Sequence, residues 1–183
     1  SNPGMASRIA HHIDFPDYSP AELLEIARRM AGEMHYEFDA PALQAMRGIQ
    51  FVHAVTLIAE LGDLTRFGSP RQLMGYLGLV PRESSSGEQR RQGSITKAGN
   101  SYARRALIEA AWAYRHPARV TRIIATRQTG LPKAACDIAW RAQLRLSAKY
   151  RRLNARHLHH NKIVVALARE LSGFVWAIGQ SVK

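Results

Sequence analysis

The chain has 183 residues, of which 46% are hydrophobic, so it can bury the core of one domain or two small ones, and wholesale disorder is excluded. Its net charge of +12 is uneven: residues 1–81 carry six Lys and Arg against nine Asp and Glu, and residues 82–183 carry twenty against five. Only the second part has the charge expected for binding a polyanion. No apolar run reaches the roughly 18 residues of a membrane span, and we expect no membrane partner.

The N-terminal part of the chain is predicted to be helical. Residues 1–4 (Ser-Asn-Pro-Gly) are interpreted as a remnant of an expression vector, and no signal peptide is recognised after them. Ser19 is a predicted N-cap of a helix over residues 19–34. We interpret residues 5–47 as a helical lead-in to a domain over residues 48–183.

The rest of the chain reads as helices separated by Gly, Pro and capping residues. The predicted helical segments are 39–48, 51–62, 69–78, 101–116, 133–156 and 161–180, and a short segment over residues 118–128 separates two of them. Strand signals are weak, because no run of residues alternates cleanly between apolar and polar. The sequence therefore predicts an all-α, multi-helix domain that carries a Ser- and Gly-rich basic loop over residues 84–100.

Gly48 and Ile49 precede a predicted helix and have two interpretations. In a helix-hairpin-helix, a Gly-apolar-Gly turn before an Ala-containing helix holds a DNA phosphate with its backbone amides. Gly48, Ile49 and Ala54 fit this pattern, whereas Gln50 stands where the second glycine is expected. The alternative is an ordinary turn between two helices, in which Gly48 ends the first helix.

The stretch SSSGEQRRQGSITKAGN gathers hydroxyls, glycines and cations with almost nothing apolar. Its hydroxyls belong to Ser84, Ser85, Ser86, Ser94 and Thr96, and the cations in or beside it are Arg82, Arg90, Arg91 and Lys97. A serine followed by glycine lets a phosphate approach the backbone closely, and a serine can attack a phosphodiester. Neighbouring cations neutralise phosphate oxygens. The alternative is a solvated surface loop without chemistry.

A basic stripe is predicted on the helix over residues 133–156. Arg141, Arg145, Lys149 and Arg152 recur at three- and four-residue spacing, and no acidic residue is interleaved with them. Such a stripe contacts backbone phosphates without reading base sequence. A merely solvated helix is expected to carry acidic partners at i, i+4, so nucleic-acid contact is the favoured interpretation.

The sequence predicts no metal site within this chain. Zinc usually needs cysteine partners, whereas the chain has one cysteine, Cys136, far from the clustered histidines at 157, 159 and 160. The acidic residues of the basic part are scattered, so a two-metal nuclease site is not expected. Cys136 is interpreted as a buried structural thiol in a protein from a reducing compartment.

Together, these residues resemble a known family. The segment LIAELGDLTRFGSPRQLMGYLGLVPRESSSGEQRRQGSITKAGNSYARRALIEAAWAYRHPARV is similar to the C-terminal transposase domain of the DEDD-type insertion-sequence transposases. This is the IS-one-ten and IS-eleven-eleven group, which is related to the Piv and MooV DNA invertases. The similarity runs from about Gly48 to Gly179 and includes an ordered series of short motifs, among them GD, RF, RQL, YLGLVP, SG, GN and RR.

The resemblance implies a larger protein. Family members have an N-terminal RuvC-like domain, a ribonuclease-H fold whose Asp-Glu-Asp-Asp ligands hold a divalent metal, expected to be magnesium. Residues 1–47 do not encode it, so the resemblance implies that this chain is the C-terminal part and carries no cofactor. It also implies DNA as substrate, a guide or bridge RNA, a homo-oligomer and a bacterial, cytoplasmic, nucleoid-associated location.

The resemblance also implies roles for individual residues. Ser86 is the expected nucleophile, joined covalently to DNA, with Ser85, Ser84, Ser94 and Thr96 as alternatives because adjacent serines leave the register open. The residues expected to contact nucleic acid are Gly48, Gly87, Arg82, Arg90, Arg91, Lys97, Arg104, Arg105, Arg141, Arg145, Lys149 and Arg152. Without the metal-binding domain, we expect the chain to bind nucleic acid and to be inactive. The alternative is a non-catalytic helical module that binds DNA or RNA or that mediates oligomerisation.

Overall fold

The structure is a computed structural model that describes residue 22, residues 40–86 and residues 89–181, without the side chains of residues 83–92. Residues 1–4, which we interpret as a vector remnant, lie outside the described residues. Almost all of the helix predicted over residues 19–34 lies outside them as well. Most of the proposed lead-in is likewise outside them. The domain predicted over residues 48–183 is described almost completely.

The described residues form seven α-helices and one small sheet, so the prediction of an all-α fold is confirmed. The α-helices are α3 (Ala40–Gln44), α4 (Phe51–Leu61), α5 (Pro70–Tyr76), α6 (Ser101–Ala111), α7 (Arg122–Gln128), α8 (Lys133–Asn154) and α9 (His160–Ser181). Two 3-10 helices, η1 (Leu64–Arg66) and η2 (Trp112–Arg115), and two strands, β1 (Pro81–Ser86) and β2 (Gln89–Ile95), complete the fold.

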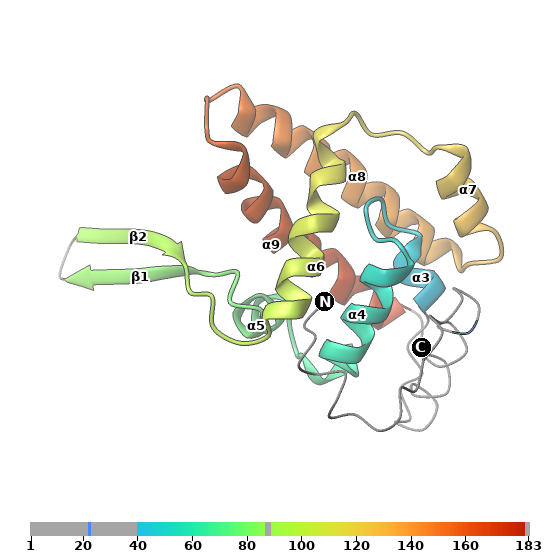
Figure 1. Ribbon diagram of the computed structural model, residues 1–183, viewed down its shortest axis with the longest axis horizontal. Coiled ribbons are helices and arrows are strands. Elements are labelled where there is room, and N and C mark those ends of the chain that lie inside the picture. The colour runs from blue at the N-terminus through green and yellow to red at the C-terminus, as the bar shows by residue number, and fades with distance from the viewer. Residues whose placement is uncertain (1–21, 23–39, 87–88, 182–183) are drawn as a thin grey trace, which may run out of the picture.

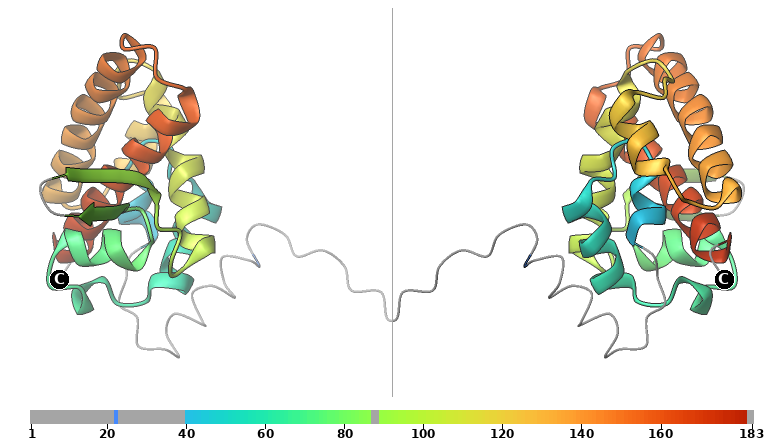
Figure 2. Two further views of the ribbon diagram at one scale, coloured as in Figure 1. Left: turned by 90° about the vertical axis from the view of Figure 1, so that its left-hand side faces the viewer. Right: turned by 90° about the vertical axis from the view of Figure 1, so that its right-hand side faces the viewer.

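Helix α9 is the central element of the core. It packs against α3, α5, α6, α8 and η1, and Figures 1 and 2 show it crossing the body among the other helices. Leu167, Leu171, Val175 and Ile178 on its inner face are fully buried. By length and composition alone, α9 could cross a membrane. Its packing in the core accounts for that apolar character.

Local capping signals set the starts of α5 and α6 where the sequence predicts them. The Ser69 hydroxyl accepts a hydrogen bond from the backbone amide of Gln72 at the start of α5. The Asn100 side chain accepts one from the amide of Ala103 at the start of α6, at 2.9 Å. Each cap satisfies one of the amides that a helix leaves unpaired in its first turn.

The polar stretch over residues 84–100 differs from the expected loop, because most of it forms an antiparallel hairpin. Strand β1 pairs with β2 in the register Ser84 with Arg91, Ser85 with Arg90 and Ser86 with Gln89. Cross-strand hydrogen bonds satisfy the backbone, so the strands need no alternating apolar pattern to form. Figure 1 shows the hairpin projecting from the helical body.

Tyr114 places a hydroxyl inside the core, and replacing Tyr114 by Phe is expected to leave the protein as stable or to stabilise it by about 1 kcal/mol. The side chain is fully buried, and its hydroxyl has no hydrogen-bond partner within the described part of the chain. Burial raises the pKa of this phenol, so the hydroxyl stays neutral. Urea unfolding of the two proteins measures the difference. A loss of more than about 1 kcal/mol would show that the hydroxyl has a partner.

Candidate nucleic-acid interface

The base of the hairpin is anchored to the body through its backbone. The amide of Thr96 donates to the Val80 carbonyl at 2.9 Å, and the amide of Lys97 donates to the Gly78 carbonyl at 3.1 Å. These bonds continue the pairing of the two strands into the segments that connect the hairpin to α5 and α6. The hairpin is therefore joined to the helices by both of its ends.

Two glycines allow these connecting segments to pack backbone against backbone. Gly78 and Gly99 have φ angles of 63° and 70°, which L-residues rarely adopt. A Cβ at Gly99 would overlap the carbonyl oxygen of Tyr76, and one at Gly78 would overlap the backbone of Ala98. Both positions therefore require glycine for space as well as for conformation.

Side chains from α4 and α6 also stabilise these connecting segments, which we call the junction between the hairpin and the helices. The Arg104 guanidinium on α6 donates to the carbonyls of Leu77 at 2.9 Å and Ala98 at 3.0 Å. The Asn100 amide donates to the Glu60 carboxylate on α4. The observed contacts of Arg104 therefore hold the junction, whereas the resemblance implies a phosphate contact for this residue.

The RF motif is also explained by packing. The guanidinium of Arg66 lies 4.6 Å from the ring centroid of Phe67 and 4.9 Å from that of Tyr76. The two rings are 5.3 Å apart and tilted, so the three side chains form a cation–π cluster beside α5. This cluster supports the helix that leads into the hairpin.

The hairpin brings several predicted site residues together. Ser84, Ser85 and Ser86 lie on β1, and Arg90 and Arg91 pair across from two of them on β2. Ser86 is the last residue of β1, and Gly87 follows it outside the described residues. The predicted serines and arginines thus lie on adjacent strands, although Ser84 and Arg91, which are paired, are seven residues apart in sequence.

The other predicted residues of this stretch lie at the hairpin base. Arg82 and Ser94 are exposed, and Arg82 donates to the Thr96 carbonyl at 3.3 Å. The Thr96 hydroxyl is buried and has no hydrogen-bond partner among the residues described. Lys97 is exposed and adopts a φ of 57°. Ser94, Thr96 and Lys97 are therefore at the body end of the hairpin, and Ser86 is at its far end.

Gly48 packs against the body. It has a φ of 85°, and a Cβ at this position would overlap the carbonyl oxygen of Ala110 on α6. Gln50 is the N-cap residue of α4, and its amide donates to His53 Nδ1 at 3.4 Å. These contacts fit the interpretation of an ordinary turn between helices. A phosphate grip at this turn stays a prediction.

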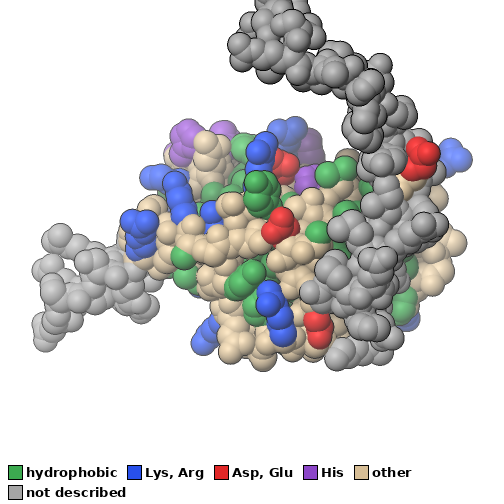
Figure 3. Space-filling model, turned by 60° about the horizontal axis from the view of Figure 1, so that its bottom comes forward, with side chains coloured by type: hydrophobic (Ala, Val, Ile, Leu, Met, Phe, Trp, Pro, Cys, Tyr) green, Lys and Arg blue, Asp and Glu red, His purple; other side chains and the backbone are tan. Residues whose placement is uncertain are grey.

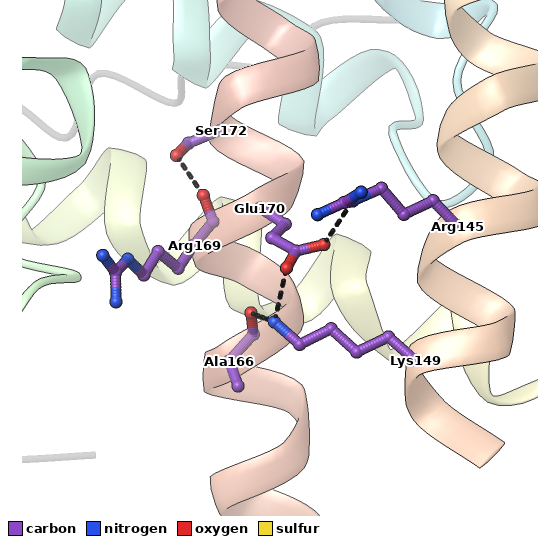
Figure 4. Close-up of polar contacts among 6 residues, drawn as sticks. All are labelled: Arg145, Lys149, Ala166, Arg169, Glu170 and Ser172. Atoms are coloured by element: carbon purple, nitrogen blue, oxygen red, sulfur yellow. Dashed lines mark hydrogen bonds and ion pairs between the residues drawn. The ribbon is translucent and has the colours of Figure 1, made fainter. Parts of the chain in front are cut away.

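The basic stripe on α8 is divided by a long-range ion pair (Figure 4). Arg145 Nε and Lys149 Nζ donate to the two carboxylate oxygens of Glu170 on α9, at 3.0 and 2.8 Å. Lys149 also donates to the Ala166 carbonyl at 3.0 Å, and its side chain is only 18% exposed. Arg145 is 67% exposed and keeps most of its surface open to solvent. Lys149 therefore mainly joins the two helices.

Arg141 and Arg152, the other two cations of the predicted stripe, are exposed and make no ion pair within the described residues. Arg105 is also exposed, but it donates to Glu109 at 2.8 Å, four residues on along α6. The hydrogen bond from Arg105 lowers the pKa of the Glu109 carboxyl, with a smaller contribution from His53. Arg141 and Arg152 are thus free to bind an anion, and Arg105 already has one partner.

Glu170 is expected to stabilise the protein at neutral pH, and replacing it by Gln should cost about 1–2 kcal/mol. Burial raises the pKa of its carboxyl, but hydrogen bonds from Lys149 and Arg145 outweigh that effect and hold it below the ordinary value of 4.5. Because the pKa is lower in the folded state, the stabilisation is present above pH 4.5 and is lost as the pH falls through the folded-state pKa.

Urea unfolding of wild type and Glu170→Gln at a series of pH values measures this contribution. The difference between them should shrink as the solution is acidified. Glu109→Gln is the matched control, because it removes a carboxylate from an exposed ion pair, which contributes little to stability. Parallel loss of stability in wild type and Glu170→Gln on acidification would contradict the assignment.

The described residues offer no set of ligands for a metal ion. No group of three His, Cys, Asp or Glu side chains among them is placed to hold one. Cys136 is half-buried, with its Sγ 4.0 Å from the Gln128 carbonyl.

Sequence reasoning missed three exposed cations: Arg156, just after the end of α8, and Lys162 and Arg169 on α9. Arg156 continues the four-residue spacing from Arg152 and lies just past the end of α8. Lys162 and Arg169 are on α9, so the spacing of residues along α8 could not select them. The available signal was the near absence of acidic residues over the last quarter of the chain, where Glu170 stands alone after Asp137.

Comparison with known proteins identifies what the chain resembles. Residues 40–125 match the family model described as Transposase IS116/IS110/IS902 family. The protein named "Putative transposase y4qE" from Sinorhizobium fredii is 45% identical over 176 residues, which cover 94% of this chain and 45% of that protein. The "Probable family 20 transposase" of Pseudomonas aeruginosa is 36% identical over 91 residues, or 50% of this chain and 27% of that protein.

A shorter similarity concerns a protein of another name. A stretch of 42 residues, 23% of this chain, is 64% identical to "Protein CfxQ" of Xanthobacter flavus and covers 13% of that protein. The chain thus spans less than half the length of each of these relatives.

Proposed function

Starting from the transposase-family match over residues 40–125, we propose that this chain is the part of a DNA transposase that carries its nucleophilic serine. The observation that carries the proposal is the hairpin Pro81–Ile95, which projects from the body inside the matched region (Figure 1). Ser86 ends its first strand, followed by Gly87, and Arg90 and Arg91 lie on the second strand. A serine held away from the body can reach a DNA strand.

The proposed chemistry is two successive transfers of one phosphoryl group. The Ser86 Oγ attacks the phosphorus of a DNA phosphodiester, its proton passes to a base, and the departing strand oxygen takes up a proton. A phosphoserine ester replaces the broken ester bond, so the number of phosphate ester bonds is unchanged. The hydroxyl of a second strand then attacks the same phosphorus, and Ser86 leaves as a hydroxyl. The first strand end is thereby exchanged for the second.

In this proposal, the arginines of the hairpin stabilise the negative charge of the reacting phosphate. Negative charge increases on the phosphate oxygens in the transition state, and guanidinium groups stabilise it when they are already in place. In the observed register Arg90 and Arg91 are on the strand next to the serines. A two-stranded ribbon also fits the major groove of DNA, so the hairpin can approach a duplex without unfolding.

The proposal includes partners beyond this chain. In it, a RuvC-like domain with magnesium supplies the rest of the active site, a guide RNA selects the DNA, and subunits associate. The enzyme acts on the bacterial nucleoid in the cytoplasm. The support is the resemblance and the fact that y4qE is more than twice as long as the part of it that this chain matches. The chain alone is then expected to be inactive.

Covalent capture tests the proposal. The complete transposase, with this chain as its C-terminal part, is incubated with a nicked DNA substrate whose cleaved end diffuses away, so that the intermediate accumulates. A band that resists boiling in detergent, followed by mass spectrometry of the peptide around Ser86, should locate a phosphoserine. Strand cleavage without any protein-linked DNA would contradict the proposal.

A second function, a non-catalytic nucleic-acid-binding module, is favoured by one observation. The cations Arg141 and Arg152 are exposed on α8 without an ion-pair partner in the described ranges. If this alternative holds, substitutions at Arg141 and Arg152 weaken binding while substitutions at the serines change nothing.

A further inference from the structure

The helices α8 and α9 carry an excess of positive charge that their fold does not use. Residues 138–183 contain nine Lys and Arg and a single acidic residue, Glu170. Glu170 is already bonded to Arg145 and Lys149. The remaining cations around the connection of α8 to α9 are Arg151, Arg152, Arg156, Lys162 and Arg169, all exposed. None of these five makes a side-chain hydrogen bond or ion pair with another described residue.

Two of these cations lie on the solvent-facing side of α9. Lys162 and Arg169 are seven residues apart, which is two helical turns, so they share one face. Figure 4 shows Arg169 projecting from α9 away from Arg145 and Lys149, on the side that does not meet α8. Arg152 is in the last turn of α8, and Arg156 lies just after the end of that helix. We call Arg152, Arg156, Lys162 and Arg169 the cationic ridge.

The ridge leads toward the hairpin. Gly173, one turn after Arg169, lies against α5: a Cβ on it would be 3.3 Å from Met74 Cε and 3.7 Å from Pro70 Cβ. Helix α5 in turn leads into β1. Figure 1 shows the hairpin and the connection of α8 to α9 projecting on the same side of the molecule, and Lys, Arg and His side chains gather at the upper left of Figure 3.

Helix stability accounts for only one member of the ridge, Arg152. Cations are favourable near the C-terminus of a helix, which explains Arg151 and Arg152 in the last turn of α8. Lys162 is in the first turn of α9, where a cation is unfavourable, and that turn has no acidic residue. Lys162 is thus unfavourable for the helix and has no contact among the described residues that compensates for this, which indicates that it binds something other than this domain.

We propose that the cationic ridge binds the sugar–phosphate backbone of a nucleic acid at a site separate from the hairpin. This deepens the proposed function, on which it rests for the presence of a nucleic acid. The ridge presents guanidinium and ammonium groups without a matching set of base-reading side chains, so it positions the backbone and does not read sequence. A strand held on the ridge lies on the side of the molecule from which the hairpin projects.

Salt-dependent binding tests the ridge. The 183-residue chain is titrated into short fluorescein-labelled DNA and RNA duplexes of unrelated sequence, and anisotropy is followed between about 50 and 200 mM salt. The double variant Lys162→Ala/Arg169→Ala should bind about tenfold more weakly, and the slope of log K against log salt should fall by about 2. Charge reversal with Arg169→Glu should weaken binding further than Arg169→Ala.

The matched control variant removes two positive charges, as the ridge variant does, but from a different part of the surface. Arg122 is exposed at the start of α7 and Arg119 is exposed three residues before it, and Figure 1 shows α7 on the side of the body away from the hairpin. If Arg119→Ala/Arg122→Ala lowers affinity and slope as much as the ridge variant, binding reflects net charge alone and the proposal fails. It also fails if wild type binds neither duplex. Unchanged circular dichroism and melting temperature of each variant exclude misfolding as the cause.

The two duplexes identify the source of the phosphates. A loss confined to DNA assigns the ridge to the substrate, and a loss confined to RNA assigns it to a guide. Since no strand is cut in this assay, its result does not depend on Ser86. If covalent capture fails but the ridge variant still weakens binding, the proposed chemistry is wrong and the proposed nucleic-acid site on the ridge is supported.

Discussion

Replacing Ser86 by alanine is expected to abolish covalent capture of DNA and to lower recombination by the complete transposase on the order of a thousandfold or more. Alanine removes the oxygen that forms the phosphoserine, and no other group in the proposed mechanism can replace it. Binding to DNA should change little, because the phosphate contacts come from cations. Recombination is measured with a donor and a target plasmid, and capture is measured on the nicked substrate.

Ser84→Ala and Ser85→Ala are the matched controls for Ser86→Ala, since they remove the same hydroxyl group from the same strand. Both variants are expected to retain capture. If instead Ser85→Ala or Ser84→Ala alone eliminates the covalent product, the nucleophile is assigned to the wrong position in the run of three serines. If all three variants recombine normally, the chemistry does not use this strand.

Replacing Gly99 by alanine is expected to destabilise the protein by about 3 kcal/mol. Its φ of 70° costs an L-residue roughly 1–2 kcal/mol. The new Cβ would in addition overlap the carbonyl oxygen of Tyr76, so the backbone must move to make room. Since this junction anchors the hairpin, capture by the complete transposase should fall as well. Urea unfolding gives the change in the free energy of unfolding.

Gly75→Ala is the control for this prediction. Gly75 lies within α5, and nothing stands within 4 Å of a Cβ built there. Alanine at such a position is expected to stabilise the helix by about 0.5–1 kcal/mol. If both variants change stability by the same amount, the close approach of Gly99 to Tyr76 does not determine the geometry of the junction.

The sequence predicts the helices of this fold well because their signals are local. Ser69 and Asn100 are recognisable as N-caps, and the structure shows both hydrogen bonds. Gly62 is predicted to end α4, and it does so with a φ of 59°. Each of these signals involves residues within one helical turn, so the helix ends that they mark can be predicted from a single sequence.

The hairpin could not be predicted from local sequence signals. Its strands are almost entirely polar and show no alternating pattern, and their pairing is a relation between two segments that local propensity does not encode. A weak signal was present: two polar runs of similar length stand on either side of Ser86, Gly87 and Glu88.

The charge pattern of α8 shows the same limit. Arg145 and Lys149 have no acidic neighbour in their own helix, which made both look free for phosphate. Their partner, Glu170, is 25 and 21 residues away on α9. The periodicity of a single helix cannot show such a partner. The serine nucleophile depends on a resemblance, and spacing alone would not have selected it from a solvated loop.

The central position of α9 has a consequence for how the protein is made. Trp176 donates to the Phe67 carbonyl across 109 positions of sequence, and Gln180 donates to the Leu64 carbonyl across 116. Because α9 is synthesised after every element it packs against, the apolar residues that it covers have no partner in the nascent chain until residues 160–181 have left the ribosome. Chaperone occupancy during translation should therefore be high for this domain and should end with the emergence of α9.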